Sequence, residues 1–237
     1  MDRNSNTYTF MFSSILVIVV ALILAFVSQA TKSKYESNIE NEKMQSILAT
    51  IGVAVDRDKA SGLYNDYIKE SLTLNADGSL NIGVNAFDIN LHKELKKDAN
   101  KQSFPLYIAE KDGKKYYVIP LYGAGLWDAI WGYVALESDK NTVAGAIFDH
   151  KGETPGLGAQ ITEKWFQEQF AGKTILTDAS AGFTDNNFIS VRTVKGGAKT
   201  DDAHAVDGIS GSTKTADGIN NMIQERLAHY LIYFQNN

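Results

Sequence analysis

The chain has 237 residues, a length that fits one domain, or one domain with an appendage. Its 23 basic and 28 acidic residues give a formal net charge of −5. This acidic balance disfavours a nucleic-acid partner, because phosphate contacts need an excess of Lys and Arg on one face. The absence of cysteine excludes disulfides, thiolate metal and iron–sulfur sites, and cysteine nucleophiles.

The N-terminal part of the chain reads as a membrane anchor. No charged residue lies between Arg3 and Lys32, and 18 of the 23 residues from 8 to 30 are apolar. About 20 such residues span the roughly 30 Å hydrocarbon core as a helix. The alternative is a cleaved signal peptide, because residues 28–30 (SQA) have the small-x-small form of a cleavage site. The apolar run is longer than a typical signal core, which favours the anchor.

Both alternatives place the residues after Thr31 outside the cytoplasm. The positive-inside rule leans the other way, since Lys32, Lys34 and Lys43 follow the apolar run while Arg3 precedes it. That rule weakens when a long domain follows the anchor. We expect the domain outside the cytoplasm and leave the conflict with the charge rule open.

Four short apolar runs have the length and composition of strands. They are residues 116–123, 130–136, 142–148 and 187–194. A short polar segment joins the second run to the third, which predicts a hairpin. Turn signals stand at residues 75–78 (NADG) and 111–114 (KDGK).

Three segments have the apolar spacing of helices. Residues 33–50 read as a polar stalk that becomes helical, and residues 162–172 read as a helix that Gly172 can end. The third segment is the C-terminal one. The apolar positions of the last two segments are Ile161, Trp165, Phe166 and Phe170, and then Ile219, Met222, Ile223, Leu227, Tyr230 and Leu231.

These patterns predict an α+β protein. An N-terminal transmembrane helix over residues 1–31 and a helical stalk over residues 32–50 precede one extracytoplasmic domain over residues 51–237. The domain is expected to have a mostly antiparallel sheet with helices packed against it.

Most catalytic motifs are missing from the sequence, including a P-loop, HExxH, GxSxG and CxxC. Residues 156–158 (GLG) resemble the start of a dinucleotide-binding fingerprint, but Ile161 stands at the third glycine position, so we reject that match. Asp149, His150 and Glu153 lie close enough in sequence to suggest the metal site of a hydrolase. A polar loop after a strand explains the same residues and is the preferred interpretation.

Two glycine-containing loops have the composition of ligand-binding turns. Residues 152–158 (GETPGLG) connect a strand to a helix, and their glycines allow close approach to the backbone. Residues 207–215 (DGISGSTKT) run into the last helix, where unpaired N–H groups and the helix dipole favour an anion. The alternatives are an ordinary connection for the first loop and simple N-capping by Ser212 or Thr213 for the second.

Together, these loops resemble a known family. Residues 207–213 (DGISGST) are similar to the Asp-x-x-Ser/Thr-Gly-Ala-Thr signature of domains that carry covalently attached FMN, and residues 152–158 resemble that family's second signature. Residues 123–127 (GAGLW) resemble a feature of one branch, the C subunits of sodium-translocating NADH:quinone oxidoreductases. The resemblance covers the anchor and roughly residues 115–232, and it leaves residues 52–110 unassigned.

The resemblance implies that the FMN phosphate is esterified to the last threonine of the signature, here Thr213. This chain has Ser212 where the family has Ala, so Ser210, Ser212 and Thr215 stay rivals for the ester. The phosphodiester keeps one negative charge, which the helix N–H groups and Lys214 could offset. The implied cofactor-binding residues are Asp207, Ser210, Gly211, Ser212, Thr213 and Lys214, then Glu153, Thr154, Gly156, Leu157 and Gly158, and finally Trp127.

Two of these residues have open roles. Asp207 either orients its turn or contributes to recognition by the enzyme that attaches the flavin. Trp127 either packs near the isoalloxazine ring or is a core aromatic residue.

The resemblance implies a membrane-anchored flavoprotein subunit that relays electrons without itself binding NADH or quinone, so no catalytic acid, base or metal ligand is expected. The expected partners are the other membrane subunits of the complex, an FAD-dependent flavin transferase and membrane lipid. The expected location is the bacterial inner membrane, with the soluble domain facing the periplasm. The alternatives are the G subunit of an Rnf-type ferredoxin:NAD reductase complex and an extracytoplasmic binding domain without flavin.

Overall fold

The computed structural model describes residues 5–237, and residues 1–4, which include Arg3 and the start of the predicted anchor, lie outside the described residues. Contacts divide the chain into two compact units that meet between Lys43 and Met44. Each unit is described by itself. The division of the chain into anchor, stalk and domain at the boundaries given above stays a prediction.

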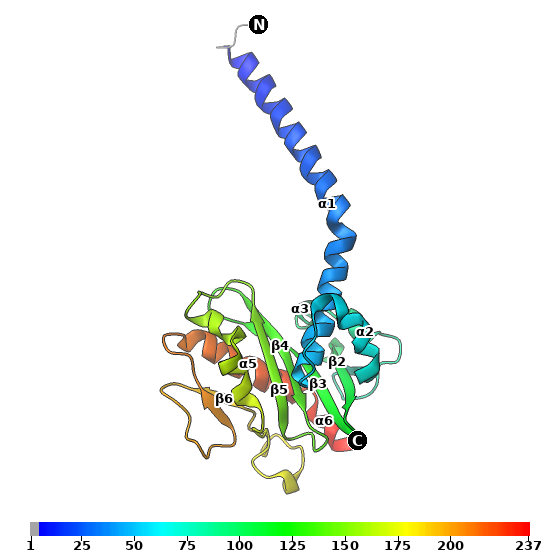
Figure 1. Ribbon diagram of the computed structural model, residues 1–237, viewed down its shortest axis with the longest axis vertical. Coiled ribbons are helices and arrows are strands. Elements are labelled where there is room, and N and C mark those ends of the chain that lie inside the picture. The colour runs from blue at the N-terminus through cyan, green and yellow to red at the C-terminus, as the bar shows by residue number, and fades with distance from the viewer. Residues whose placement is uncertain (1–4) are drawn as a thin grey trace. The chain divides into compact units, whose positions relative to one another are not determined.

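The N-terminal unit is the first part of one long helix, α1 (Asn6–Thr50). Among the described residues, α1 alone is long and apolar enough to cross a membrane, judged by length and composition (Figure 1). The apolar side chains of its N-terminal part are exposed, and Phe10 and Phe26 are each 75% exposed. A helical surface of this length and composition is suited to lipid rather than to water.

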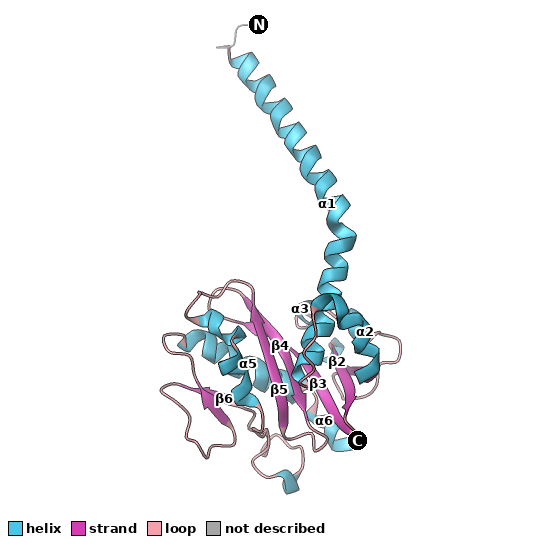
Figure 2. Cartoon of the chain, viewed as in Figure 1, coloured by secondary structure: helices cyan, strands magenta, loops and turns pink. Residues whose placement is uncertain are grey.

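The second unit is built on a five-stranded antiparallel sheet, in which neighbours in sequence are neighbours in space. Helices pack against this sheet, which confirms the predicted α+β class (Figure 2). The predicted hairpin is confirmed as the last two strands of the sheet. The strands are β1 (Ile68–Asn75), β2 (Ser103–Lys111), β3 (Lys114–Ala124), β4 (Ala129–Leu136) and β5 (Val143–His150).

The predicted turn at residues 111–114 joins β2 to β3. Asp112 and Gly113 both have positive φ, at 53° and 75°. A two-residue hairpin turn of this kind matches the right-handed twist of the strands that it connects, and it favours the Asp-Gly sequence found here.

Both faces of the sheet are covered, so successive residues of β2, β3 and β4 enter two different cores. Ile119 and Leu121 enter the core that contains residues of α5 (Thr213–Ala228) and α6 (Leu231–Asn236). Val118 enters the core on the other face, together with the end of α1 and α2 (Arg57–Tyr67). Figure 1 shows α5, in orange and red, passing behind the sheet.

The segment from residue 52 to residue 110, which the sequence left unassigned, supplies α2, β1, β2 and the short helix α3 (Leu91–Glu94). It therefore completes one edge of the sheet and most of the second core. Two further strands, β6 (Arg192–Val194) and β7 (Ala205–Asp207), form a separate parallel pair.

The predicted continuous helix over residues 162–172 is wrong. Glu163 has an extended backbone, with φ −77° and ψ 141°, and it separates a short turn over Gly158–Thr162 from α4 (Lys164–Gln167). A further short turn, over Glu168–Phe170, follows α4. Phe166 and Phe170 are buried as predicted, whereas Trp165 is 46% exposed. Adjacent residues of a helical turn point in different directions, so Trp165 cannot share the core-facing side of Phe166.

The predicted strand over residues 187–194 is also wrong over most of its length, because only β6 is a strand. Ser190 has φ 65°, which interrupts an extended backbone. The predicted C-terminal helix is divided, since α5 ends at Ala228 and α6 begins at Leu231. The six apolar positions of this segment are nevertheless all buried.

Candidate functional site

The carboxylate of Glu153 joins three segments of the chain. Its Oε1 accepts a hydrogen bond from the backbone N–H of Trp127 at 3.0 Å, and its Oε2 accepts one from the Thr215 hydroxyl at 2.5 Å. Glu153 is 4% exposed. A buried carboxylate needs such donors to offset its lost hydration. This network holds the GAGLW segment, the loop over residues 152–158 and the first turn of α5 against one another.

The two loops singled out in the sequence lie in contact, and this contact requires glycine at two positions. A Cβ atom on Gly158 would clash with Glu153 Oε2 and would lie 2.5 Å from Thr215 Oγ1. A Cβ atom on Gly211 would lie 2.9 Å from Leu157 Cδ2, and Gly211 has φ 75°, a region that L-residues rarely adopt. A side chain at either position would push the loops apart.

The N-terminus of α5 has no side-chain cap. Ser212 occupies the N-cap position, with φ −119° and ψ 38°, but its side chain makes no capping hydrogen bond. Simple N-capping therefore does not explain this segment. The N–H groups of a first helical turn have no partner within the helix, and together with the helix dipole they are suited to an anion.

The four hydroxyls that compete for the predicted ester have different surroundings. The Thr215 hydroxyl is bonded to Glu153, and the Ser212 Oγ is buried without a hydrogen-bond partner. Thr213 and Ser210 are exposed and line the same cavity. Two of the four candidates therefore present a hydroxyl that a large ligand can reach.

This cavity has a volume of about 580 Å³ and lies at the start of α5. Residues 207–211 and Thr213 form one side of it. Lys195, Gly197 and Trp165, which the sequence did not indicate as site residues, come from other segments. The adjacent glycines at 196 and 197, which follow the apolar run over residues 187–194 after Lys195, are a turn signal that could have identified part of this wall.

Asp207 orients the loop that faces it. Its Oδ1 accepts a hydrogen bond from the Ala198 N–H at 2.7 Å, and its own N–H donates to Gln169 Oε1 at 2.8 Å. The geometry supports the first of its two predicted roles, the orientation of the turn.

The two lysines near the start of α5 differ in position. The Lys214 side chain is 75% exposed, its Nζ lies 4.0 Å from an Asp217 carboxylate oxygen, and Lys214 does not line the cavity. Lys195 does line it. The positive charge nearest to a ligand in the cavity is therefore expected from Lys195 rather than from Lys214.

Trp127 is not a core residue, because it is 69% exposed. Its indole Nε1 donates to the Thr154 hydroxyl at 3.0 Å, and its backbone N–H donates to Glu153. Leu157, on the same loop as Thr154, is 42% exposed. The two contacts of Trp127 hold an exposed aromatic ring beside this loop.

The alternative metal site has other partners for its ligands. Asp149 Oδ1 accepts from the His150 N–H at 2.7 Å, and His150 Nδ1 accepts from the Glu153 N–H at 3.2 Å. The Glu153 carboxylate is bonded to Trp127 and Thr215. Among residues 5–237, no group of three His, Cys, Asp or Glu side chains is placed to hold a metal ion.

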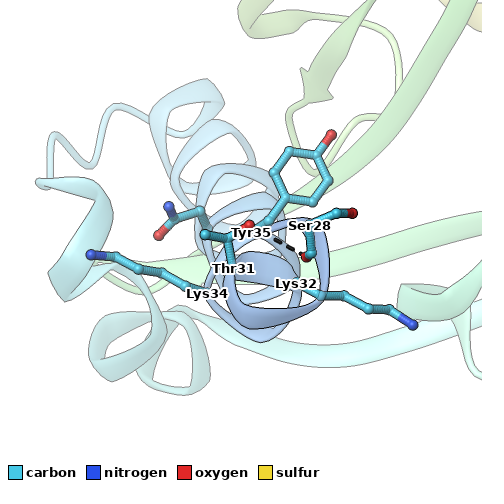
Figure 3. Close-up of a pocket in the computed structure, with 6 residues that line it drawn as sticks. Ser28, Thr31, Lys32, Lys34 and Tyr35 are labelled. Atoms are coloured by element: carbon cyan, nitrogen blue, oxygen red, sulfur yellow. Dashed lines mark hydrogen bonds between the residues drawn. The ribbon is translucent and has the colours of Figure 1, made fainter. Parts of the chain in front are cut away.

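A separate hollow lies on the surface of α1 alone, just after its apolar segment (Figure 3). The Lys32 and Lys34 side chains extend away from the helix in opposite directions, and Tyr35 follows Lys34 on the same turn (Figure 3). Thr31 Oγ1 donates to the Ser28 carbonyl at 3.4 Å. Tyrosine and lysine at this point are typical of the boundary between a membrane and water.

Comparison with known proteins identifies the same region of the chain. The family described as the FMN-binding domain matches residues 125–228, a range that contains both loops and the first turn of α5. Two relatives are named as the C subunit of Na(+)-translocating NADH-quinone reductase. The one from Vibrio vulnificus is 29% identical, and the match covers 86% of this chain and 84% of the relative. The one from Yersinia pestis is 28% identical, with coverage of 92% and 88%.

Solved structures have the same fold as this chain. The NqrC structure from Shewanella oneidensis is 27% identical with a TM-score of 0.69, and the match covers 83% of this chain and 96% of that one. The crystal structure of the Na(+)-translocating NADH-quinone reductase C subunit from Parabacteroides distasonis is 37% identical with a TM-score of 0.76. That match covers 87% of this chain and 97% of the other. On this identity and coverage, the chain belongs to the family of Na(+)-translocating NADH-quinone reductase C subunits.

Proposed function

We propose that the chain is a membrane-anchored flavoprotein subunit that relays electrons within a sodium-translocating NADH:quinone oxidoreductase complex. It would do so through an FMN group attached by its phosphate to Thr213. The observation that carries the proposal is the exposed Thr213 at the edge of a cavity, at the start of a helix whose N-terminus lacks a side-chain cap. The matched FMN-binding domain and the C-subunit relatives support it.

The surroundings of Thr213 fit a phosphate ester. Lys195 lines the cavity with a positive charge, the first turn of α5 offers unpaired N–H groups, and the buried Ser212 Oγ has no partner. These groups would offset the one negative charge of a phosphodiester. Lys214 would contribute less, because its side chain lies beside Asp217.

The exposed apolar side chains of Trp127 and Leu157 are the proposed contacts of the flavin ring, together with the backbone at Gly156. Gly158 is buried and would act indirectly, because it lets the loop lie against Thr215. Thr154 and Glu153 would act on the ring indirectly, because they hold the Trp127 indole and backbone. When bound, FMN supplies the redox chemistry, and the protein supplies attachment, orientation and electrostatics.

Attachment would need a separate flavin transferase that uses FAD. The Thr213 oxygen would form a bond to the phosphorus of the FMN half, the pyrophosphate bond of FAD would break, and AMP would leave as the hydroxyl proton is released. The tether would keep the flavin with the protein outside the cytoplasm.

The apolar segment of α1 would anchor the chain in the bacterial inner membrane, with the folded domain facing the periplasm and the other subunits of the complex nearby.

The test uses the full chain expressed with a flavin transferase. We expect flavin fluorescence from the denatured protein on a gel, and an FMN adduct on the peptide that contains Thr213. Thr213→Ala should abolish both signals. Ser210→Ala is the matched control, because it removes the other exposed hydroxyl of the same cavity and should leave both signals intact. Fluorescence that persists in Thr213→Ala but not in Ser210→Ala would move the ester to Ser210.

The membrane topology has its own test. Protease added to spheroplasts should digest the domain after residue 43 if it faces the periplasm. Protection of the domain would reverse the proposed orientation. Copurification of the full chain with the other subunits tests its membership of the complex.

A further inference from the structure

A second cavity lies away from Thr213, between the GAGLW segment and the end of α5. Its volume is about 750 Å³, which is within the range of small-molecule sites. Tyr122, Leu95 and Leu126 give it apolar walls, and Trp127 lies at its edge. Its polar side chains come from both ends of the lining: Arg226, His229, Glu225 and Gln102, and also His92 and Asp128, whose carboxylate is paired with Lys151. Nothing in the proposed flavin attachment uses these polar groups.

Arg226 is the unusual residue of this cavity, because it is buried and incompletely paired. It is 8% exposed, and its Nε and Nη1 atoms are buried without a hydrogen-bond partner. A guanidinium has five N–H donors, and these two atoms carry three of them. Buried donors that lack an acceptor are costly, and an acceptor from outside the chain, such as a water or a ligand group, would offset that cost.

His229 adds a second unpaired polar atom to the same cavity. Its ring stacks on Phe104 with centroids 4.0 Å apart, and its Nε2 is buried without a partner. Burial and the neighbouring Arg226 charge lower the pKa of His229 to about 4, so the ring is neutral near pH 7. Of these two neighbouring residues, Arg226 is therefore the one that carries a positive charge near pH 7.

The present partner of Arg226 is a poor one. Glu225 Oε2 accepts from Arg226 Nη2 at 2.6 Å, but the Glu225 side chain is 63% exposed while that of Arg226 is 9% exposed. Adjacent residues on a helix do not face each other, so Glu225 has to reach around the helix to make this contact. Only the Glu225 side of this pair is exposed, so an incoming carboxylate could replace Glu225 while the buried Arg226 keeps a negatively charged partner.

We propose that this cavity binds a carboxylate group carried on a flat apolar body, and that Arg226 pairs with the carboxylate in place of Glu225. The apolar walls fit the body, and the charge-assisted bonds to Arg226 fix its orientation. The ligand would contact Leu126 and Trp127, whose backbone is bonded to Glu153. A ligand bound in the cavity would therefore contact Trp127 and could change the position of its ring.

The experiment uses the full flavin-loaded chain in detergent and two probes of nearly equal shape, benzoate and the neutral benzamide. Equilibrium dialysis measures the affinity, and the indole N–H resonances of isotope-labelled tryptophan report the location. We expect benzoate to bind saturably and to shift the Trp127 resonance. Trp131 and Trp165 do not line this cavity, so their resonances are internal controls. Benzamide should bind at least about ten-fold more weakly, a difference of about 1.4 kcal/mol.

Two variants test the role of the ion pair. Arg226→Gln should abolish benzoate binding, with unchanged Trp131 and Trp165 resonances as evidence of a folded domain. Glu225→Gln changes an exposed residue and should strengthen benzoate binding several-fold, because it removes the competing carboxylate. Equal affinity for benzamide, a Trp127 resonance that does not move, or a Glu225→Gln variant with unchanged affinity would each overturn the proposal.

A further measurement, benzoate binding to the assembled complex, distinguishes two sources of the natural carboxylate. If another subunit supplies the carboxylate and its apolar body, benzoate binding should be lost in the assembled complex. If it belongs to a free small molecule, binding should persist there. The attachment of FMN at Thr213 is measured independently by gel fluorescence, so failure of either proposal can be recognised without the other.

Discussion

Thr215 Oγ1 donates a hydrogen bond to Glu153 Oε2 at 2.5 Å, and both side chains are buried. The two residues are 62 positions apart in the sequence. Their contact connects the loop over residues 152–158 to the first turn of α5. In that turn, Thr215 lies two residues after Thr213. The position of the proposed FMN ester therefore depends on a carboxylate in a different part of the chain.

The first prediction concerns the charge and shape of Glu153. Glu153→Leu removes both acceptors and leaves the Trp127 N–H and the Thr215 hydroxyl unpaired, so we expect a loss of about 2–4 kcal/mol in the free energy of unfolding. Glu153→Gln keeps the shape and one carbonyl acceptor, and Thr215 can accept from its amide, so the loss should be near 1 kcal/mol. Denaturant unfolding measures both.

Thr215 provides the matched controls for that experiment. Thr215→Val removes the hydroxyl while it keeps the volume, and Thr215→Ser keeps the hydroxyl. We expect Thr215→Val to destabilise the domain by about 1–3 kcal/mol, and Thr215→Ser to retain the bond to Glu153. Both variants should still carry FMN at Thr213 if they fold. Equal stability of Thr215→Val and Thr215→Ser would contradict the role assigned to the hydroxyl.

A second prediction separates backbone strain from side-chain crowding in the two loops. Gly211 and Gly156 have the same φ of 75°, but only Gly211 has an atom within reach of a new Cβ, Leu157 Cδ2 at 2.9 Å. Gly156→Ala should therefore cost about 1 kcal/mol from the backbone alone. Gly211→Ala should cost more by roughly another 1 kcal/mol, because Leu157 has to move.

The readout for this pair combines thermal unfolding with the amount of attached flavin. We expect Gly211→Ala to lower the fraction of flavin-loaded protein more than Gly156→Ala does, since Gly211 lines the cavity and Gly156 does not. The same loss of stability and loading in both variants would show that the contact between Gly211 and Leu157 has no effect.

The third prediction is a pH dependence of stability that comes from His229. Burial and the Arg226 charge lower the pKa of His229 from 6.5 to about 4 in the folded state. Between these values the unfolded chain binds a proton that the folded chain does not, so stability should fall as the pH decreases from about 6.5 to 4. The ring is partly exposed, and we expect a discounted effect of about 1–2 kcal/mol.

His229→Gln tests the source of that dependence. The variant lacks the titrating ring, so its free energy of unfolding should change less between pH 6.5 and 4 than that of the parent chain. Urea unfolding at several pH values measures the difference. An identical pH dependence in the two proteins would assign the effect to other groups.

The sequence predicted which loops meet better than it predicted the secondary structure around them. The two signature loops and Trp127 lie together, as their resemblance to one family implies, because family motifs record residues that meet in space. The sequence placed Trp165 in the core, and it lines the cavity of Thr213 instead. Helical periodicity cannot predict the exposure of Trp165. The extended backbone at Glu163 interrupts the helix, so the spacing from Ile161 no longer tells which of the following residues face the core.

The sequence by itself determined the long apolar helix, the α+β class and the two loops, because hydrophobic periodicity, charge-free length and glycine patterns are local properties. Only the tertiary structure decided that the Thr215 hydroxyl is hydrogen-bonded to Glu153, that Ser212 is buried, and that Lys195 rather than Lys214 lines the cavity. Each of these facts depends on segments far apart in the chain. Packing of β5 and α5 around one core sets the distances between these segments, and no local pattern encodes that packing.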